Sequence, residues 1–563
     1  MAWSNDLKEK MAKKSWTPAF ILSLRSVLSE DTEDTWIPWA AGTMPPDAGL
    51  SDDSVRIGSI PRTKDTTHAA TENWLDPQSI EMPMQRVSLD NFTWSGNQWS
   101  VTVGVSVGDD EIVNRLVPGA FVALSIGDPS YKMHEYRRIA MGLLEEVMWV
   151  KYGARLVISD LLMVSNADRA HVPENFGYTT TTCSLTSNYT AGDSTLDVDD
   201  TSAFLPDGDG VYTLRLQPLD EPAFLVHAAG ATATSFTGVS GARYNTTAVD
   251  IATGTGSEIK QAFRVEGHPA DMIAQVLTST GLGTNGANDT EPAAVGYGLP
   301  ECLVDTADMD VWRPTVDPVT GAIAFDLPVW NSADAEETYP DGRMVEGSRS
   351  MLAWLGQVGI MAVERQGQYT MRALQAGVGL GGEIDSGVTI QLKDVVEFKG
   401  VDQWKPPWNY EYTTFEVRED GSLASAVNEE VYLTRPGAGT ATVDLTGYLT
   451  NNQAAVVESI ADRVGPYVTG NLEVLKIRLG GLHWYKVCIL DIVTLGDLTA
   501  LTRPYGPMDA ARGRTDSTYL GYNGQKAMVI GRRMELPWPS VYLELAILPW
   551  SGSFDIPALN DGG

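Results

Sequence analysis

Residues 98–107 of the chain read QWSVTVGVSV, and this stretch decides the fold class. Apolar side chains alternate in it with small or polar ones, and the apolar positions are Trp99, Val101, Val103, Val105 and Val107. A period of two is typical of a β-strand that buries one face. We therefore expect Trp99 to be buried with these valines rather than exposed to a ligand.

Similar runs continue on the C-terminal side of this strand. Residues 120–126, 137–149 and 154–158 are strand-like, and the turn residues Gly127-Asp128-Pro129 and Gly153 separate them. Short apolar runs divided by turn residues indicate antiparallel pairing, so residues 80–165 are predicted to form one antiparallel β unit. Residues 141–150 could instead form a helix, because periodicity alone does not settle the structure of so apolar a run.

The rest of the chain is predicted to be mainly β with an α+β insertion. Its 563 residues contain 54 Gly and 30 Pro without a period, which suits turns and short strands better than long helices. A chain of this length corresponds to roughly three to five domains. We expect an N-terminal arm with an opening strand at 18–28 (1–79), a first β-barrel (80–173), a small inserted β module (174–263), a mid-chain α+β domain (264–384) and a second β-barrel (385–563).

Each of the last three segments has its own pattern of expected elements. The inserted module is predicted to have strands at 195–198, 211–216, 223–226 and 235–239. In the α+β domain, a helix should open at 268–271 and bury Met272, Ile273, Val276 and Leu277, and a second helix from Ser348 should precede a hairpin with strands at 360–364 and 369–374. The last segment should have a helix at 452–464 and strands at 388–392, 408–417, 430–433, 472–479, 492–495, 527–534 and 541–548.

Charge and cysteine content exclude several classes of protein. The 40 basic and 73 acidic residues give a net charge of −33, which disfavours a protein that grips nucleic acid through basic patches. Cys183, Cys302 and Cys488 lie far apart, so neither a disulfide framework nor a zinc site is indicated. The apolar stretch 19–24 is too short for a signal peptide, and no run is long enough to span a bilayer, so we expect a soluble protein from a reducing cytoplasm or assembled there.

No motif in the chain assembles a catalytic, cofactor-binding or metal site. The glycine-rich stretches 281–286 and 377–382 match G-x-G-x-x-G but lack the strand before and the helix after, which favours loops over nucleotide binding. The acidic stretch 197–209 lacks EF-hand spacing, so turns are favoured over Ca²⁺, although this pattern leaves a cation possible. We therefore predict no enzyme activity and no cofactor, also because hydrolase signatures are absent and the histidines are dispersed at His68, His134, His171, His227, His268 and His483.

The order of elements from residue 80 onward resembles the central tail-hub, or baseplate-hub, proteins of long-tailed bacteriophages. Residues 98–162, with 117–122 and 156–162, look like the first hub barrel, and the helix and hairpin at 348–374 are similar to the mid-chain unit of that family. The second barrel is similar over 452–464, 472–479, 491–495, 529–533 and 541–545, and the module resembles a tail-tip insertion over 195–198, 222–226, 235–239 and 245–247. One departure is Leu490-Asp491-Ile492-Val493, where the family usually has glycine before the aspartate.

This resemblance implies a structural virion protein at the tail tip, assembled in the host cytoplasm. It implies a homotrimer whose two barrels per subunit alternate in a pseudo-sixfold ring that joins the sixfold tail tube to the threefold tip. The implied partners are the distal tail ring, the tail tube and tail-tip or fibre proteins, and genomic DNA would pass through the ring without tight binding. A negative net charge agrees with such a channel, because like charges repel.

Two other classes of function stay open from the residues alone. A carbohydrate-active tail enzyme would use paired carboxylates, whose pairing in space no sequence of 73 acidic residues can exclude. A carbohydrate-binding adhesin would use exposed tryptophans such as those of 404–408 or Trp538, although buried or domain-packing tryptophan is the more common situation.

Overall fold

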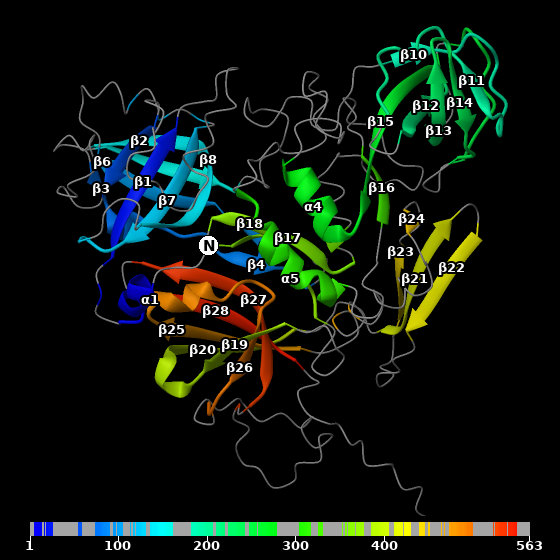
Figure 1. Cartoon of the computed structure of the whole chain (residues 1–563). Coiled ribbons are helices and arrows are strands. Elements are labelled where there is room, and N and C mark those ends of the chain that lie inside the picture. Colours follow the sequence, from blue (N-terminus) through cyan, green and yellow to red (C-terminus); the bar gives the residue numbers. More distant parts are fainter. Residues whose placement is uncertain are drawn as a thin grey trace, which may run out of the picture.

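A computed structural model describes the protein over residues 5–25, 54–58, 74–160, 182–278, 303–316, 325–329, 352–404, 410–428, 439–450, 472–498 and 522–548, with short gaps inside these ranges, and at Arg463 and Tyr467. Within this part of the chain, strands far outnumber helices and form five sheets (Figure 1). The predicted mainly β fold class is confirmed.

The first sheet has seven antiparallel strands in the order β2-β1-β7-β8-β9-β6-β3. Its two edge strands, β2 and β3, contact each other, so the sheet curls back on itself. Trp99, Val101 and Val103 on β6 are at most 2% exposed, as their alternation predicts. The strands are β1 (Ala19–Arg25), β2 (Ser54–Gly58), β3 (Trp74–Leu75), β6 (Trp99–Gly104), β7 (Phe121–Gly127), β8 (Arg137–Val150) and β9 (Gly153–Ser159).

The second sheet is built mostly from the C-terminal part of the chain, in the order β19-β26-β27-β28-β25-β20. The two edge strands, β19 and β20, are consecutive in sequence and are joined by the short 3-10 helix η5 (Leu392–Asp394). The end of β19 and the start of β20 therefore lie close together. β4 pairs with β27 at Gly531 and Arg532, and β5 pairs with β4. The strands are β4 (Gln85–Val87), β5 (Trp94–Gly96), β19 (Asp385–Ile390), β20 (Val395–Trp404), β25 (Leu472–Gly480), β26 (Ile492–Leu495), β27 (Lys526–Glu535) and β28 (Ser540–Ile547).

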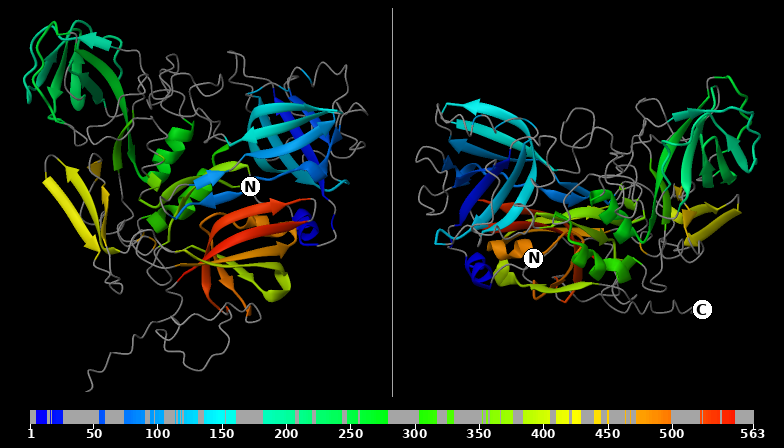
Figure 2. Two further views of the ribbon diagram at one scale, coloured as in Figure 1. Left: turned by 180° about the vertical axis from the view of Figure 1, so that it is seen from behind. Right: turned by 45° about the horizontal axis from the view of Figure 1, so that its top comes forward.

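The inserted module has a hydrophobic core of its own, separate from the core shared by the rest of the described chain. Leu196, Phe224 and Phe236 lie in this separate core. The long strand β15 leads out of the module and pairs with β16, which pairs with β24 (Figures 1 and 2). The strands are β10 (Thr182–Ser184), β11 (Thr195–Asp197), β12 (Tyr212–Gln217), β13 (Phe224–Thr232), β14 (Ser235–Val239), β15 (Glu258–Gly267), β16 (Phe325–Val329) and β24 (Leu449–Thr450).

Between the two curled sheets lies a two-stranded hairpin of β17 (Ile360–Arg365) and β18 (Gln368–Ala373), called the central hairpin below (Figure 1). Helix α5 (Thr306–Val316) packs on β18, and α4 (Pro269–Thr278) packs on α5. A separate three-stranded sheet has the order β22-β21-β23. Its strands are β21 (Tyr410–Glu419), β22 (Ser422–Asn428) and β23 (Gly439–Asp444).

Most elements expected from hydrophobic patterns are present. Residues 141–150 lie in β8, so the helical alternative for them is wrong. Helix α4 buries Met272, Ile273, Val276 and Leu277 as expected. The remaining helix predictions are largely untested, because 452–464 is described only at Arg463, and of the helix from Ser348 only Leu352, Leu355 and Gly356 are seen to be helical. The strand expected at 430–433 also lies outside the described residues.

Strand pairing crosses expected segment boundaries, and two cases are the clearest. The segment expected to be an arm, residues 1–79, contributes β1, β2 and β3 to the first sheet. In the other direction, β4 and β5 lie within the expected first barrel but pair into the second sheet. Sequence patterns specify a strand and its buried face but not its partner, which explains both differences. The five-segment division itself stays a prediction.

The turn before β26 keeps an unusual backbone shape without the expected glycine. Leu490 has φ 65, the left-handed region, and it is the single residue other than glycine with positive φ in the described part of the chain. Its N–H donates to the Val529 carbonyl at 2.7 Å, and its side chain is fully buried. A non-glycine residue there costs about 1–2 kcal/mol, which the surrounding contacts must offset.

Candidate functional site

The central hairpin forms the junction between the two curled sheets. Its strands are buried on both faces, and Gly367 in the turn has φ 77. A β-carbon on Gly367 would lie 2.4–2.8 Å from Arg138 of the first sheet, so only glycine permits this close approach. The Tyr369 hydroxyl donates to Asp160, just after β9, at 3.1 Å.

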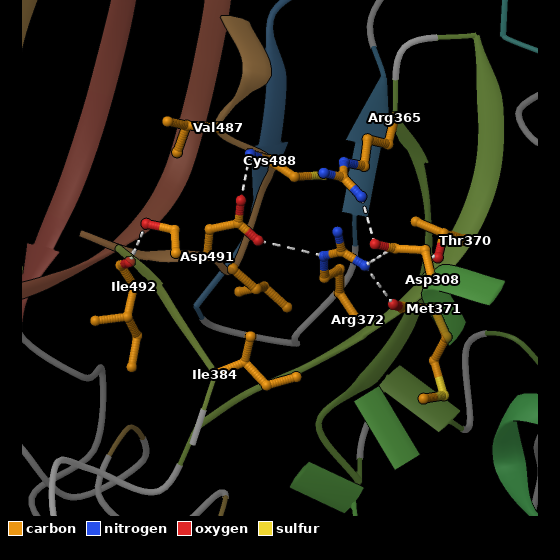
Figure 3. A network of polar contacts seen from close by, with 12 residues as sticks. Asp308, Arg365, Thr370, Met371, Arg372, Ile384, Val487, Cys488, Asp491 and Ile492 are labelled. Atoms are coloured by element: carbon orange, nitrogen blue, oxygen red, sulfur yellow. Dashed lines mark hydrogen bonds and ion pairs between the residues drawn. The ribbon is translucent and has the colours of Figure 1, made fainter. Parts of the chain in front are cut away.

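Arg372 joins the hairpin to α5 and to the start of β26 (Figure 3). Its side chain is 1% exposed. One guanidinium nitrogen donates to the Asp308 carboxylate and, at 2.9 Å, to the Met371 carbonyl, while Nε lies 3.5 Å from Asp491. The guanidinium also stacks over Trp312, 4.6 Å from the ring centroid. This buried cation therefore has partners on three elements.

The two carboxylates around Arg372, those of Asp308 and Asp491, also accept hydrogen bonds from other residues of the protein. Asp308 also accepts hydrogen bonds from Arg365 and, at 2.8 Å, from the Thr370 hydroxyl. Burial alone would raise the pKa of Asp308, but Arg372 and Arg365 outweigh it and lower that pKa below its usual value. Asp491 accepts the Cys488 N–H at 2.7 Å, which closes the turn before β26 (Figure 3).

Arg532 on β27 makes a second buried network from the other side of the hairpin. Its side chain is completely buried, and its guanidinium donates to the carbonyls of Tyr485 at 3.0 Å, Val487 at 2.8 Å and Glu364 at 3.1 Å. Its Nε donates to the side-chain oxygen of Gln85 on β4. The second sheet, β4 and the central hairpin are thus tied at one point.

Glu364 is the acidic group of this second network. Its carboxylate accepts hydrogen bonds from the Gln85 side chain and from the Gly367 N–H at the hairpin turn. Burial raises the pKa of Glu364, and the nearby Arg532 and Arg138 guanidiniums oppose that rise only in part. A third arginine, Arg463, donates to the Val358 carbonyl at 3.1 Å and to the Val316 carbonyl at the end of α5.

In this arrangement the ionised side chains hold neighbouring elements together. The carboxylates of Asp308, Glu364 and Asp491 are each bound by protein donors, and burial raises the pKa of the Cys488 thiol. A buried thiol that stays protonated is a poor nucleophile and a poor metal ligand. Within the described residues, no group of three His, Cys, Asp or Glu side chains is arranged to hold a metal ion.

Of the residues singled out in the sequence, those that the structure describes are not brought together into one site. Both glycine-rich stretches, 281–286 and 377–382, lie outside the described residues, as do Asp207, Asp209, Trp408, Trp538 and Cys302. Asp197 accepts from the Ser187 hydroxyl at 2.9 Å, and Asp199 accepts from the Ser184 N–H at 2.9 Å, as expected of carboxylates in turns. Of the histidines, His68, His134 and His171 are outside the described part, and His227, His268 and His483 lie on separate elements.

The junction residues gave no signal in the sequence. Arg532 stands within an apolar strand, and both faces of β27 are buried, so alternation does not mark its inward side. Asp308 and Arg372 are 64 residues apart. Only a charged residue within a strand-like apolar run could have hinted at a buried ion pair.

Comparisons with known proteins give similarity in structure alone. The sequence matches no protein-family model and no curated protein. A tail protein from Neisseria meningitidis MC58 has 10% identity and a TM-score of 0.32, and covers 83% of this chain and 92% of its own. The 43 kDa tail protein of prophage MuSo2 from Shewanella oneidensis has 7% identity and a TM-score of 0.29, covering 85% and 98%.

A chain of the virion of a native gene transfer agent particle is also similar, with 13% identity and a TM-score of 0.19, covering 46% of this chain and 84% of its own. In the described part of this chain, no helix has the length and apolar character needed to cross a membrane.

Proposed function

We propose that this chain is a structural protein of a phage tail, and specifically the central hub whose three copies form a ring at the tail tip. The observation that carries the proposal is the junction: a central hairpin is tied to α5 and to the second sheet by the buried Arg372 and Arg532, and it meets the first sheet through Tyr369 and Asp160. In a loaded assembly, such a junction would keep the hairpin in place on the second sheet, because removing one partner of a buried ion pair is strongly destabilising.

Charge and element order also support a channel-forming hub. With a net charge of −33, the lumen of a ring is expected to be acidic or neutral, so that DNA passes without tight binding. The expected neighbours are the tail tube, the distal tail ring and tail-tip or fibre proteins. The junction carboxylates are bound by arginine or amide donors, which leaves them unsuited to general acid or base work and agrees with a role without catalysis.

Mass and symmetry of the purified chain test this proposal. We expect light scattering to give three times the 60.9 kDa of one chain, and negative-stain images to contain threefold or pseudo-sixfold rings. Duplex DNA should bind weakly or not at all at physiological salt. A stable monomer, or tight DNA binding that falls steeply with salt, would contradict the hub.

Two further measurements separate the alternatives. Turnover of cell-wall glycans that is abolished by single Asp→Asn or Glu→Gln changes would establish an enzyme. Binding of the isolated chain to host cells, without assembly with tail proteins, would establish an adhesin. The hub predicts neither result.

A further inference from the structure

The N-terminal helix α1 (Asn5–Met11) lies against the second sheet, although the chain next enters the first sheet at β1 (Figure 1). It contacts the 3-10 helix η6 (Leu482–Lys486), which packs on β27 and β28. Leu7 and Met11 are fully buried. At Gly481, with φ 94, a β-carbon would lie 3.0 Å from the Met11 carbonyl, so the helix end approaches the second sheet closely.

The same segment also contacts the first sheet, through Asp128. This aspartate follows directly after β7 of the first sheet. The Lys10 Nζ lies 3.3 Å from its carboxylate, and Trp16 Nε1 donates to it at 3.0 Å. Helix α1 and Trp16, called the N-terminal brace below, therefore connect the two curled sheets at a second place, apart from the central hairpin.

The polar contacts of the brace are more exposed than those of the junction. The side chains of Lys10 and Asp128 are 22% and 16% exposed, whereas those of Arg372 and Arg532 are at most 1% exposed. The helix has only seven residues, too few to be stable alone in water. Partly exposed ion pairs contribute little, and short terminal elements open locally at low free energy.

We propose that the N-terminal brace is a releasable tie between the two curled sheets. When α1 leaves η6, the sheets change their relative angle about the central hairpin while each stays folded. This proposal concerns contacts within a single chain, so it does not depend on whether three copies form a ring.

Hydrogen exchange of the full chain, followed by mass spectrometry, tests the release. Peptides covering 5–16 should exchange at least about tenfold faster than peptides of β27 and of the central hairpin. The double variant Lys10→Met, Trp16→Phe removes both contacts with Asp128 and should speed exchange of 5–11 and 482–486 about tenfold further, with hairpin exchange unchanged. Lys8→Met is the matched control, because Lys8 is exposed on the same helix, and it should change nothing.

A distance measurement tests the change of angle. Spin labels at Glu146→Cys on β8 and Lys393→Cys on η5, in a Cys302→Ser background, report on the two sheets, since Cys183 and Cys488 are buried. The Lys10→Met, Trp16→Phe variant should broaden or shift the distribution of distances between the two spin labels. An unchanged distribution, or faster exchange of the central hairpin together with 5–11, would overturn the proposal, because the brace would then be part of one cooperative unit.

Discussion

At the scale of single residues, the buried arginines distinguish this junction from an ordinary apolar core. Arg532 satisfies three backbone carbonyls that belong to η6, to the turn after it and to the central hairpin. An apolar side chain of similar size would fill the space but leave those three carbonyls without their donor and remove the cation beside the Glu364 carboxylate. The cation therefore specifies which elements meet, in addition to any stability it contributes.

Replacing Arg532 tests this role. Arg532→Met should lower the free energy of unfolding by about 3–5 kcal/mol, because it leaves three buried carbonyls without a donor and removes the cation beside the buried Glu364. Arg533→Met is the matched control on the same strand, since the Arg533 side chain is 44% exposed and pairs with Glu535 near the surface. The control should cost about 1 kcal/mol or less. Urea unfolding measures both, and equal losses would rule out a special role for the buried cation.

Asp128 makes one part of the stability dependent on pH. Burial alone would raise its pKa, but hydrogen bonds from Ser130, Trp16 and Lys10 outweigh burial and lower the pKa to about 2. A carboxylate with a lowered pKa in the folded state stabilises the protein above its unfolded value, 3.8, and this contribution disappears as the pH falls toward 2. Asp128→Asn should therefore flatten the stability curve between pH 4 and pH 2. If the free energy of unfolding of Asp128→Asn fell as steeply as that of the wild type between pH 4 and pH 2, Asp128 would not be the source of this pH dependence.

At the scale of elements, the hairpin turn depends on the glycine at position 367. Gly367→Ala meets both an unfavourable φ of 77 and the Arg138 side chain, and should cost about 2–4 kcal/mol in total. Gly387→Ala is the matched control, because Gly387 has φ 66 but nothing within 4 Å of the added β-carbon. It should cost only about 1 kcal/mol. Thermal unfolding that gives the same loss for both variants would place the turn of the hairpin away from the first sheet.

The elements also mark how far the sequence could predict the structure. The strand at Trp99 and the buried face of α4 follow from local periodicity, which depends on the backbone alone. The pairing of β4 with β27 does not, because strand partners more than 400 residues apart leave no local pattern. Helix α5 was missed because its apolar face is weak and Pro314 lies inside it. The junction was missed for the same reason as the strand pairing, since its charges meet only in space.

At the scale of the whole molecule, the separate core of the inserted module predicts two unfolding transitions. Scanning calorimetry of the full chain should resolve a transition of the module, because its core does not merge with that of the curled sheets. Arg532→Met should lower the temperature of the larger transition and leave the module transition in place. Phe236→Ala, in the module core, should do the reverse. A single transition that shifts with both variants would mean that the module and the sheets unfold as one unit.

The pairing of β4 with β27 has a consequence for how the chain is made. β4 leaves the ribosome early, but its partner strand is synthesised more than 400 residues later. At about 5–20 residues per second, β4 waits roughly 20–90 seconds for that partner. During that interval β5 can cover one edge of β4, but the edge that faces β27 stays open to other nascent chains. We therefore expect completion of the second sheet to depend on chaperones and on uninterrupted translation.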